Sequence, residues 1–190
     1  MKVVGLAGEP GSGKSAVARE FSRREGVVWI ELDREAWETY RPRSPTYWRL
    51  VSRFGKGILA PDGAISRLHL AELAFRTEDA RQALSAIVHP AVIDRLRERI
   101  ASEKERGTRV LLVEGALLAS SPHVDRTLFD AILVLETSSC TRAGRLAADG
   151  RPEHTARAIG TPAPGGFVRV SAEGTLVETT ERVAQAIAAL

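Results

Sequence analysis

Two kinds of hydrophobic pattern divide the chain. Short runs of nearly continuous apolar residues are typical of strands buried in a parallel sheet. Between the first two runs, apolar residues recur at helical spacing, which predicts strand, loop, helix and strand, the opening unit of a parallel α/β sheet. The predicted strands are residues 2–7 (KVVGLA), 27–33 (VVWIELD), 109–115 (RVLLVEG), 130–136 (DAILVLE) and a short one within 166–175 (GFVRVSAEGT).

Residues 34–105 carry no convincing strand pattern. Their apolar positions follow helical spacing, first through Phe75 and then from Leu84 to Ile100. Pro90 fits the first turn of a helix but not its middle, which predicts a helix boundary near His89. The pattern therefore predicts a sheet whose order along the chain is interrupted by a helical insertion, followed by a C-terminal helix.

Length and composition indicate one globular domain. The chain has 190 residues, of which 44% are hydrophobic and 27% are charged. No apolar run approaches the roughly 20 residues that cross a bilayer, and glycines interrupt the N-terminal run, so we expect a cytoplasmic protein that neither binds a membrane nor carries a secretory signal. The single cysteine, Cys140, excludes an intrachain disulfide.

Charge gives no sign of nucleic-acid binding. The 27 basic and 24 acidic residues leave a net charge of +3, and the two kinds alternate, as in residues 95–106 (RLRERIASEKER). Such alternation is typical of a solvated helix face. The oligomeric state does not follow from the sequence, which is compatible with a monomer.

The strongest chemical motif is GEPGSGKS at residues 8–15, which fits the phosphate-loop pattern G-x-x-x-x-G-K-[ST] between a predicted strand and helix. Its glycines let successive N–H groups point at phosphate oxygens, and the helix N-terminus adds a favourable dipole. Lys14 would reach the β- and γ-phosphates of ATP, and the Ser15 hydroxyl would ligate Mg²⁺. The predicted ATP-binding residues of the loop are Gly8, Gly11, Ser12, Gly13, Lys14, Ser15 and Ala16.

Two acidic residues lie at the carboxyl ends of predicted strands. Ligands of such sheets bind beyond the carboxyl ends of the strands, where Asp33 and Glu114 are expected. Asp33 could accept the proton of an attacking hydroxyl, hold Mg²⁺ through water, or merely cap a helix over residues 34–40. Glu114 is a candidate to orient the water shell of the metal, or a merely buried acid, and Glu31 is expected to face away.

Residues 54–75 (FGKGILAPDGAISRLHLAELAF) and 84–92 (LSAIVHPAV) resemble the signature of the dephospho-CoA kinase family. With the phosphate loop and Asp33, the resemblance covers nearly the first hundred residues. It implies a P-loop kinase fold with five parallel strands, a helical substrate region, a lid, and transfer of the ATP γ-phosphate to the ribose 3′-hydroxyl of dephospho-CoA. It also implies that Asp33 is the base, and that Arg67 and His89 shape the substrate side.

The second half departs from the family pattern. Where the family has D-A-D, this chain has ELD at residues 31–33, and where the family has P-L-L-F-E, it has ALLAS at 116–120. The lid sequence is RLAADG at 145–150, and a GTPAPGG stretch follows at 160–166. The spacing does not decide which lid arginine contacts ATP. The candidates are Arg142, Arg145, Arg151 and Arg157, and Arg145 is our prediction.

The aromatic segment around residues 37–48 allows two interpretations. Trp37, Tyr40, Tyr47 and Trp48 are predicted to pack around a loop rather than to form a base-stacking platform. Arg41 beside them is a candidate for the phosphates of the substrate, with a solvated surface as the alternative.

We therefore predict one P-loop kinase domain over residues 1–190, with dephospho-CoA as acceptor and ATP and Mg²⁺ as cofactors. The alternatives are another small-molecule kinase, of nucleoside or nucleotide type, or a nucleotide-binding regulator without turnover. The drifted lid favours both alternatives, whereas His89-Pro90 opposes the first and Asp33 opposes the second. The predicted parts are a core of residues 1–33, 106–140 and 161–190, a helical substrate region at 34–105, and a lid at 141–160.

Overall fold

The structure, a computed structural model, describes residues 1–115, 118–119, 124–150 and 167–190. Contacts within the chain group it into two compact units. The sheet unit comprises Met1–Glu31 and Ile100–Leu190, and the helical unit comprises Leu32–Arg99. The predicted lid is described as far as residue 150, and residues 151–160 of it lie outside the described part.

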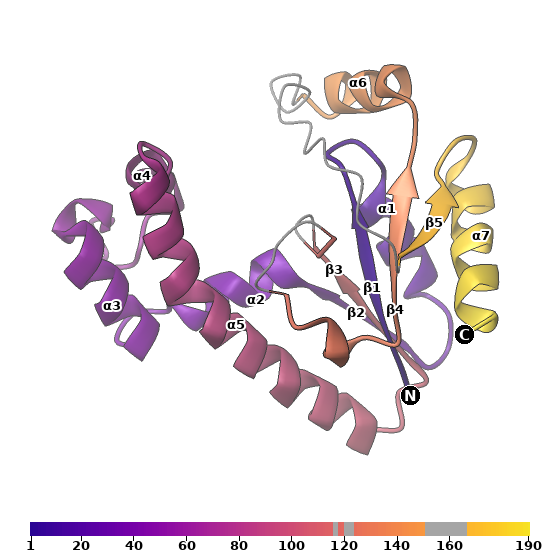
Figure 1. Cartoon of the computed structure of the whole chain (residues 1–190), viewed down its shortest axis with the longest axis horizontal. Helices are drawn as coiled ribbons and strands as arrows, with labels where there is room; N and C mark the ends of the chain where they lie inside the picture. Colours follow the sequence, from indigo (N-terminus) through magenta and orange to yellow (C-terminus); the bar gives the residue numbers. More distant parts are fainter. Residues whose placement is uncertain (116–117, 120–123, 151–166) are drawn as a thin grey trace. The chain divides into compact units, whose positions relative to one another are not determined.

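The sheet unit is built on five parallel strands in the order β2-β3-β1-β4-β5, which confirms the predicted fold class (Figure 1). β1 lies at the centre, and five of its seven residues are buried, as expected for a strand covered on both faces. The strands are β1 (Lys2–Gly8), β2 (Val27–Glu31), β3 (Val110–Glu114), β4 (Ala131–Glu136) and β5 (Val168–Ser171).

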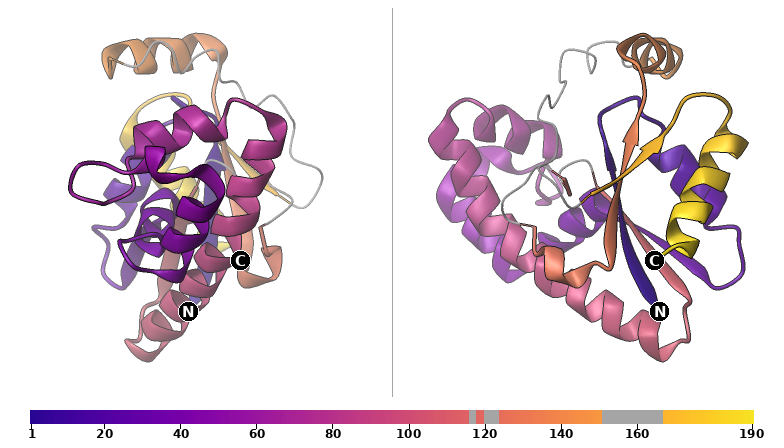
Figure 2. Two further views of the ribbon diagram at one scale, coloured as in Figure 1. Left: turned by 90° about the vertical axis from the view of Figure 1, so that its left-hand side faces the viewer. Right: turned by 45° about the vertical axis from the view of Figure 1, so that its right-hand side comes forward.

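Helices α1 (Lys14–Phe21) and α7 (Leu176–Ala188) lie side by side against the sheet (Figures 1 and 2). Their apolar sides join Leu112 and Leu133 of the strands in one buried cluster, to which they contribute Val17, Ala18, Phe21, Val183 and Ile187. Removing this apolar surface from water is the main stabilising contribution to the unit. The unit also contains α6 (Ser139–Ala148) and a short 3₁₀ helix, η2 (Arg126–Leu128).

The helical unit has its own apolar core. Its helices are α2 (Leu32–Thr39), α3 (Pro45–Phe54), η1 (Lys56–Ile58), α4 (Arg67–Ala74) and the part of α5 (Glu78–Glu105) up to Arg99. They enclose Leu50, Ile58, Leu70, Ile87, Val88 and Val92. Serine side chains cap two of these helices, since Ser44 accepts from the Tyr47 N–H and Ser66 from the His69 N–H. No helix in the described ranges is long and apolar enough to cross a membrane.

The predicted helix boundary near His89 is wrong, because α5 continues from Glu78 to Glu105 with Pro90 inside it. Proline removes one backbone hydrogen bond and crowds the preceding turn. Here Pro90 is exposed, while Val88 and Val92 on either side of it are buried at helical spacing. Packing of the apolar side of the helix therefore outweighs the local penalty.

The predicted end of the second strand is also wrong. β2 ends at Glu31, and Asp33 lies in the first turn of α2 rather than at the end of a strand. α2 begins at Leu32, so Asp33 is inside the helix and is not its N-cap. A carboxylate in this first turn still stabilises the helix through the helix dipole.

Candidate active site

The loop after β1 has the backbone that a phosphate loop requires. Gly11 and Gly13 have φ angles of 80° and 91°, in the left-handed region that glycine adopts without strain. A Cβ at Gly11 would also lie 2.8 Å from the Arg142 carbonyl oxygen, so this position excludes any side chain. α1 begins at Lys14, directly after the loop, so the N–H groups of its first turn have no partner within the helix.

Lys14 reaches back over this loop. Its Nζ donates to the carbonyl oxygens of Gly8, at 2.9 Å, and Glu9, at 3.0 Å. The ammonium group is thus held beside the N–H groups that would bind phosphate oxygens. Ser12 within the loop is buried, with 1% of its surface exposed, which limits how far the loop can rearrange.

Ser15 and Glu114 form a polar pair beside Lys14. The Ser15 hydroxyl donates to Glu114 Oε1 at 2.5 Å, and Glu114 is buried at the end of β3. Burial raises the pKa of the Glu114 carboxyl, against the opposing effects of the Ser15 hydrogen bond and the Lys14 charge. Its Oε2 is buried without a hydrogen-bond partner in the part of the chain that the structure describes.

The expectation that Glu31 faces away from this acid is wrong. In the parallel pairing of β2 with β3, Glu31 is the register partner of Glu114, so both side chains lie on the same side of the sheet. The charge of Glu31 accordingly adds to the rise in the pKa of Glu114. The carboxyl ends of β2 and β3 therefore bring two acids together.

Two arginines of α6 lie against the phosphate loop. The buried Arg142 forms an ion pair with Glu9. Arg145 donates to the carbonyl oxygens of Ser12, at 3.2 Å, and Ala172, at 2.9 Å. The pair of Arg142 with Glu9 is a contact that the sequence reasoning missed, because no local pattern links two residues 133 positions apart. Arg151 and Arg157, the other two candidates, lie outside the described residues.

In the helical unit, four residues come together: Asp33, Trp37, Tyr40 and Arg67. The first three are spaced i, i+4 and i+7, which is one face of α2 and the residue that follows it. The Arg67 guanidinium carbon lies 3.2 Å from the centroid of a Trp37 ring. Burial raises the pKa of the Tyr40 phenol, Arg67 lowers it, and Asp33 raises it further, so Tyr40 lies near both charges.

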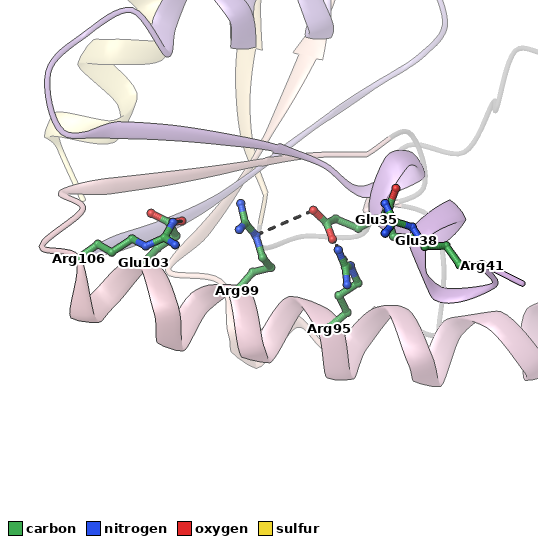
Figure 3. Close-up of polar contacts among 7 residues, drawn as sticks. All are labelled: Glu35, Glu38, Arg41, Arg95, Arg99, Glu103 and Arg106. Atoms are coloured by element: carbon green, nitrogen blue, oxygen red, sulfur yellow. Dashed lines mark hydrogen bonds and ion pairs between the residues drawn. The ribbon is translucent and has the colours of Figure 1, made fainter. Parts of the chain in front are cut away.

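Glu35 holds the first turns of α2 against α5. It forms ion pairs with Arg95 and, at 3.9 Å, with Arg99, as Figure 3 shows. Arg41 pairs with Glu38 and is 71% exposed, which matches the solvated alternative better than a preformed phosphate site. His89 is half-buried in α5.

Three of the four aromatic residues of this segment, Trp37, Tyr47 and Trp48, belong to helices, and Tyr40 directly follows α2. Tyr47 and Trp48 stand in α3 with their rings edge to face, 5.0 Å apart between centroids. The Tyr47 hydroxyl donates to the Gly63 carbonyl at 2.9 Å, so this ring has a structural role. Trp37 is different, because its ring contacts a cation.

The donor set of the sheet unit suits a hard cation with oxygen ligands. No group of three or more His, Cys, Asp or Glu side chains gathers in the described ranges. Mg²⁺ usually binds through one or two protein oxygens together with phosphates and waters. The Ser15 hydroxyl and the buried Glu114 carboxyl beside the phosphate loop fit that pattern.

Comparisons with known proteins point to one family. The family model described as dephospho-CoA kinase matches residues 2–160. The dephospho-CoA kinase of Geobacter sulfurreducens is 38% identical over 151 residues, 79% of this chain and 75% of the relative. That of Corynebacterium jeikeium is 32% identical over 186 residues, 97% of this chain and 94% of the relative.

Solved structures share the fold. The crystal structure of TT1252 from Thermus thermophilus matches with a TM-score of 0.77 and 26% identity, over 99% of this chain and 96% of that one. A dephospho-CoA kinase from Campylobacter jejuni matches with a TM-score of 0.66 over the same shares of both chains. At 18% identity, the second likeness concerns the fold alone.

Proposed function

The chain belongs to the dephospho-CoA kinase family, and from this we propose that it transfers the γ-phosphoryl group of ATP to the ribose 3′-hydroxyl of dephospho-CoA, giving coenzyme A and ADP. The observation that carries the proposal is the family match, which runs through both the phosphate loop and the helical unit. It disfavours a nucleotide kinase, and a regulator without turnover is distinguished by the assay below.

The phosphate loop would bind the triphosphate of ATP. Its N–H groups and the N-terminus of α1 offer hydrogen bonds to the phosphate oxygens, and Lys14 supplies a positive charge that can follow the γ-phosphate. Lys14 Nζ donates to the carbonyl oxygens of Gly8 and Glu9, and phosphate oxygens would compete with these carbonyls for its hydrogen bonds. Arg145 would add charge from α6.

Ser15 and Glu114 would hold Mg²⁺, Ser15 directly and Glu114 through water. The ion would neutralise charge on the β- and γ-phosphates. Before the ion binds, Ser15 satisfies one oxygen of the buried carboxylate. Glu114 therefore keeps the Ser15 side chain in place at the head of α1.

Asp33 would act on the acceptor. As the 3′-oxygen forms its bond to the γ-phosphorus, the bond from that phosphorus to the β,γ-bridging oxygen breaks, and the hydroxyl proton passes to the Asp33 carboxylate. Its exposed position in the first turn of α2 supports this role, because a general base has to be reachable by the acceptor. Asp33 binding Mg²⁺ through water stays the alternative.

The substrate side would include Arg67 and His89, and Arg41 remains the weakest candidate because it already pairs with Glu38. ATP and dephospho-CoA, both small molecules, are the partners that we propose. The expectations of no nucleic-acid partner, no membrane binding, a cytoplasmic location and a monomer stay predictions.

An ADP-release assay with several acceptors tests the proposal. We expect turnover with dephospho-CoA and Mg²⁺, and none above the acceptor-free rate with adenosine or AMP. Turnover with AMP but not dephospho-CoA would contradict the proposal in favour of a nucleotide kinase. Binding of ATP without turnover of any acceptor would favour the regulator.

A further inference from the structure

The contact between Arg67 and Trp37 differs from the other arginine contacts of the helical unit, since Arg53, which also lies over an aromatic ring, that of Phe54, is at the same time paired with a carboxylate. Arg41, Arg53 and Arg95 each form an ion pair with a carboxylate, on Glu38, Asp79 and Glu35 respectively. Arg67 forms no ion pair within the described part of the chain, and the face of its guanidinium lies on an indole ring. Trp37 therefore holds the Arg67 side chain in place without neutralising its positive charge.

This arrangement leaves Arg67 ready for an anion. An aromatic ring occupies one flat face of a guanidinium, whereas the N–H groups point outward in the plane of the group. Arg67 is exposed, so these donors are accessible to a ligand. A planar fork of N–H donors matches the oxygens of a phosphate, which it can bind through two parallel hydrogen bonds.

The position of the pair adds a second constraint. Arg67 is the first residue of α4, and Trp37 lies one helical turn after Asp33 on the same face of α2. Tyr40 lies near enough to both Asp33 and Arg67 for each charge to change its pKa. An anion bound at Arg67 would consequently lie on the side of α2 that carries the proposed base.

We propose that Trp37 is a positioning residue, which holds Arg67 flat so that its edge binds the diphosphate of dephospho-CoA. This inference rests on the proposed function. The diphosphate is attached at the 5′ position of the same ribose whose 3′-hydroxyl is phosphorylated. Binding it at Arg67 therefore restricts where the 3′-hydroxyl can lie relative to Asp33, which is how remote binding contacts orient a reacting group.

A double-mutant cycle tests the role of Trp37. The wild type, Trp37→Leu, Arg67→Ala and the double variant are compared by kcat and by KM for dephospho-CoA and for ATP. Trp37→Leu is expected to raise KM for dephospho-CoA about tenfold, and Arg67→Ala about 10- to 100-fold, while KM for ATP changes less than about twofold. In the Arg67→Ala background, loss of Trp37 should change KM less than about twofold, because there is no guanidinium left to position.

Two further variants separate positioning from folding. Trp37→Phe keeps an aromatic face and should retain most of the wild-type KM, whereas Trp48→Leu removes an exposed tryptophan of the same unit that stacks on no arginine in the described chain, and should leave KM unchanged. Melting temperatures of all variants check that they are folded.

The outcomes distinguish the two proposals. Wild-type turnover of dephospho-CoA, with coupled effects of Trp37 and Arg67 confined to KM for dephospho-CoA, would support the positioning role. Turnover with additive effects, or an equal rise of both KM values, would overturn the inference alone. Absence of dephospho-CoA turnover in the wild type would overturn the proposed function and this inference with it.

Discussion

The Lys14 side chain lies over the phosphate loop and donates hydrogen bonds to two carbonyl groups of that loop. Lys14→Ala removes its charge while leaving the apolar core of α1 and the strands in place. We expect turnover to fall by at least about 100-fold and KM for ATP to rise, because a charge that stabilises the transferred phosphoryl group is lost.

The measurement for Lys14 is steady-state turnover with circular dichroism of the same samples. Lys104→Ala, which removes an exposed lysine of α5, is the matched control and should keep wild-type turnover. A folded Lys14→Ala protein with near wild-type turnover would show that GEPGSGKS is not a catalytic phosphate loop.

Asp33 has two possible roles that one substitution separates. Asp33→Asn keeps the shape of the side chain but cannot accept a proton or carry negative charge. We expect kcat to fall by two or more orders of magnitude, with little change in ATP affinity, as for the loss of a general base.

The control for Asp33 is Asp94→Asn, which removes an exposed acid of α5 and should keep wild-type kcat. If Asp33→Asn lowers the melting temperature while leaving kcat unchanged, Asp33 stabilises the first turn of α2 and the base lies elsewhere.

Glu114 links stability to pH through its raised pKa. In the folded protein the carboxyl holds its proton more tightly than in the unfolded chain, so its contribution to stability is complete below the unfolded pKa and is lost as pH rises through the folded pKa. Glu114→Gln lacks this titration. The melting temperature of the variant, relative to wild type, should therefore be higher at pH 8 than at pH 4.5.

Turnover should move the other way in Glu114→Gln, falling at pH 8, because the amide cannot supply negative charge to the metal shell. The test is to measure the melting temperatures of Glu114→Gln and the wild type at pH 4.5 and pH 8, and their turnover at pH 8. A pH-independent difference in melting temperature between variant and wild type would contradict the raised pKa.

At the scale of elements, Glu173 fixes the start of α6, the helix that carries Arg142 and Arg145. Its carboxylate accepts from the Ser138 N–H and from the hydroxyls of Thr137, at 2.7 Å, and Thr141, at 3.0 Å. These hydrogen bonds, that of Ser138 foremost, lower the pKa of Glu173 to about 2.

Because the pKa of Glu173 is lower in the folded protein than in the unfolded chain, its carboxylate stabilises the fold. This contribution is complete above pH 4.5, the pKa of the unfolded chain, and is lost as the pH falls through about 2. Glu173→Gln should therefore melt below the wild type at pH 7, and the difference should shrink between pH 4.5 and 2. Thermal melts at pH 7, 4 and 2.5 measure this. Glu181→Gln, at an exposed position of α7, controls for loss of a surface charge. A difference that persists unchanged at pH 2.5 would contradict the role of the carboxylate.

At the scale of the whole molecule, the two units have separate apolar cores, so ligands can stabilise them separately. Dephospho-CoA should slow amide hydrogen exchange mainly within residues 32–99, and a non-hydrolysable ATP analogue mainly within residues 8–20 and 142–150. A bound ligand opposes the local opening of the segments that it contacts, and amide hydrogens in those segments then exchange more slowly.

Hydrogen exchange followed by mass spectrometry, with each ligand alone and with both together, measures these patterns. Dephospho-CoA protection confined to the phosphate loop would remove the helical unit from the acceptor site. Lys14→Ala with the ATP analogue is the matched control, and it should lose protection around residues 8–20 while keeping the dephospho-CoA pattern.

Much of the fold followed from the sequence because its signals are local. Four of the five strands lie within predicted apolar runs, and β1 extends one residue past its run, to Gly8. The phosphate loop carries its own spacing of glycines, lysine and serine. The helical nature of residues 34–105 was predicted from spacing alone, and the structure adds only an isolated bridge between Leu59 and Ile65. Backbone propensity and side-chain periodicity are properties of neighbouring residues, so they can be read from the chain.

Other features depended on contacts between distant residues. Pro90 stays inside α5 because its neighbours pack in a core assembled from three other elements. Arg142 meets Glu9, and Arg67 meets Trp37, across 133 and 30 positions of sequence, which are differences of the residue numbers. The sequence alone determined the strands and the phosphate loop. Only the tertiary structure decided which charges are paired and which remain available, because pairing depends on distance in space and burial.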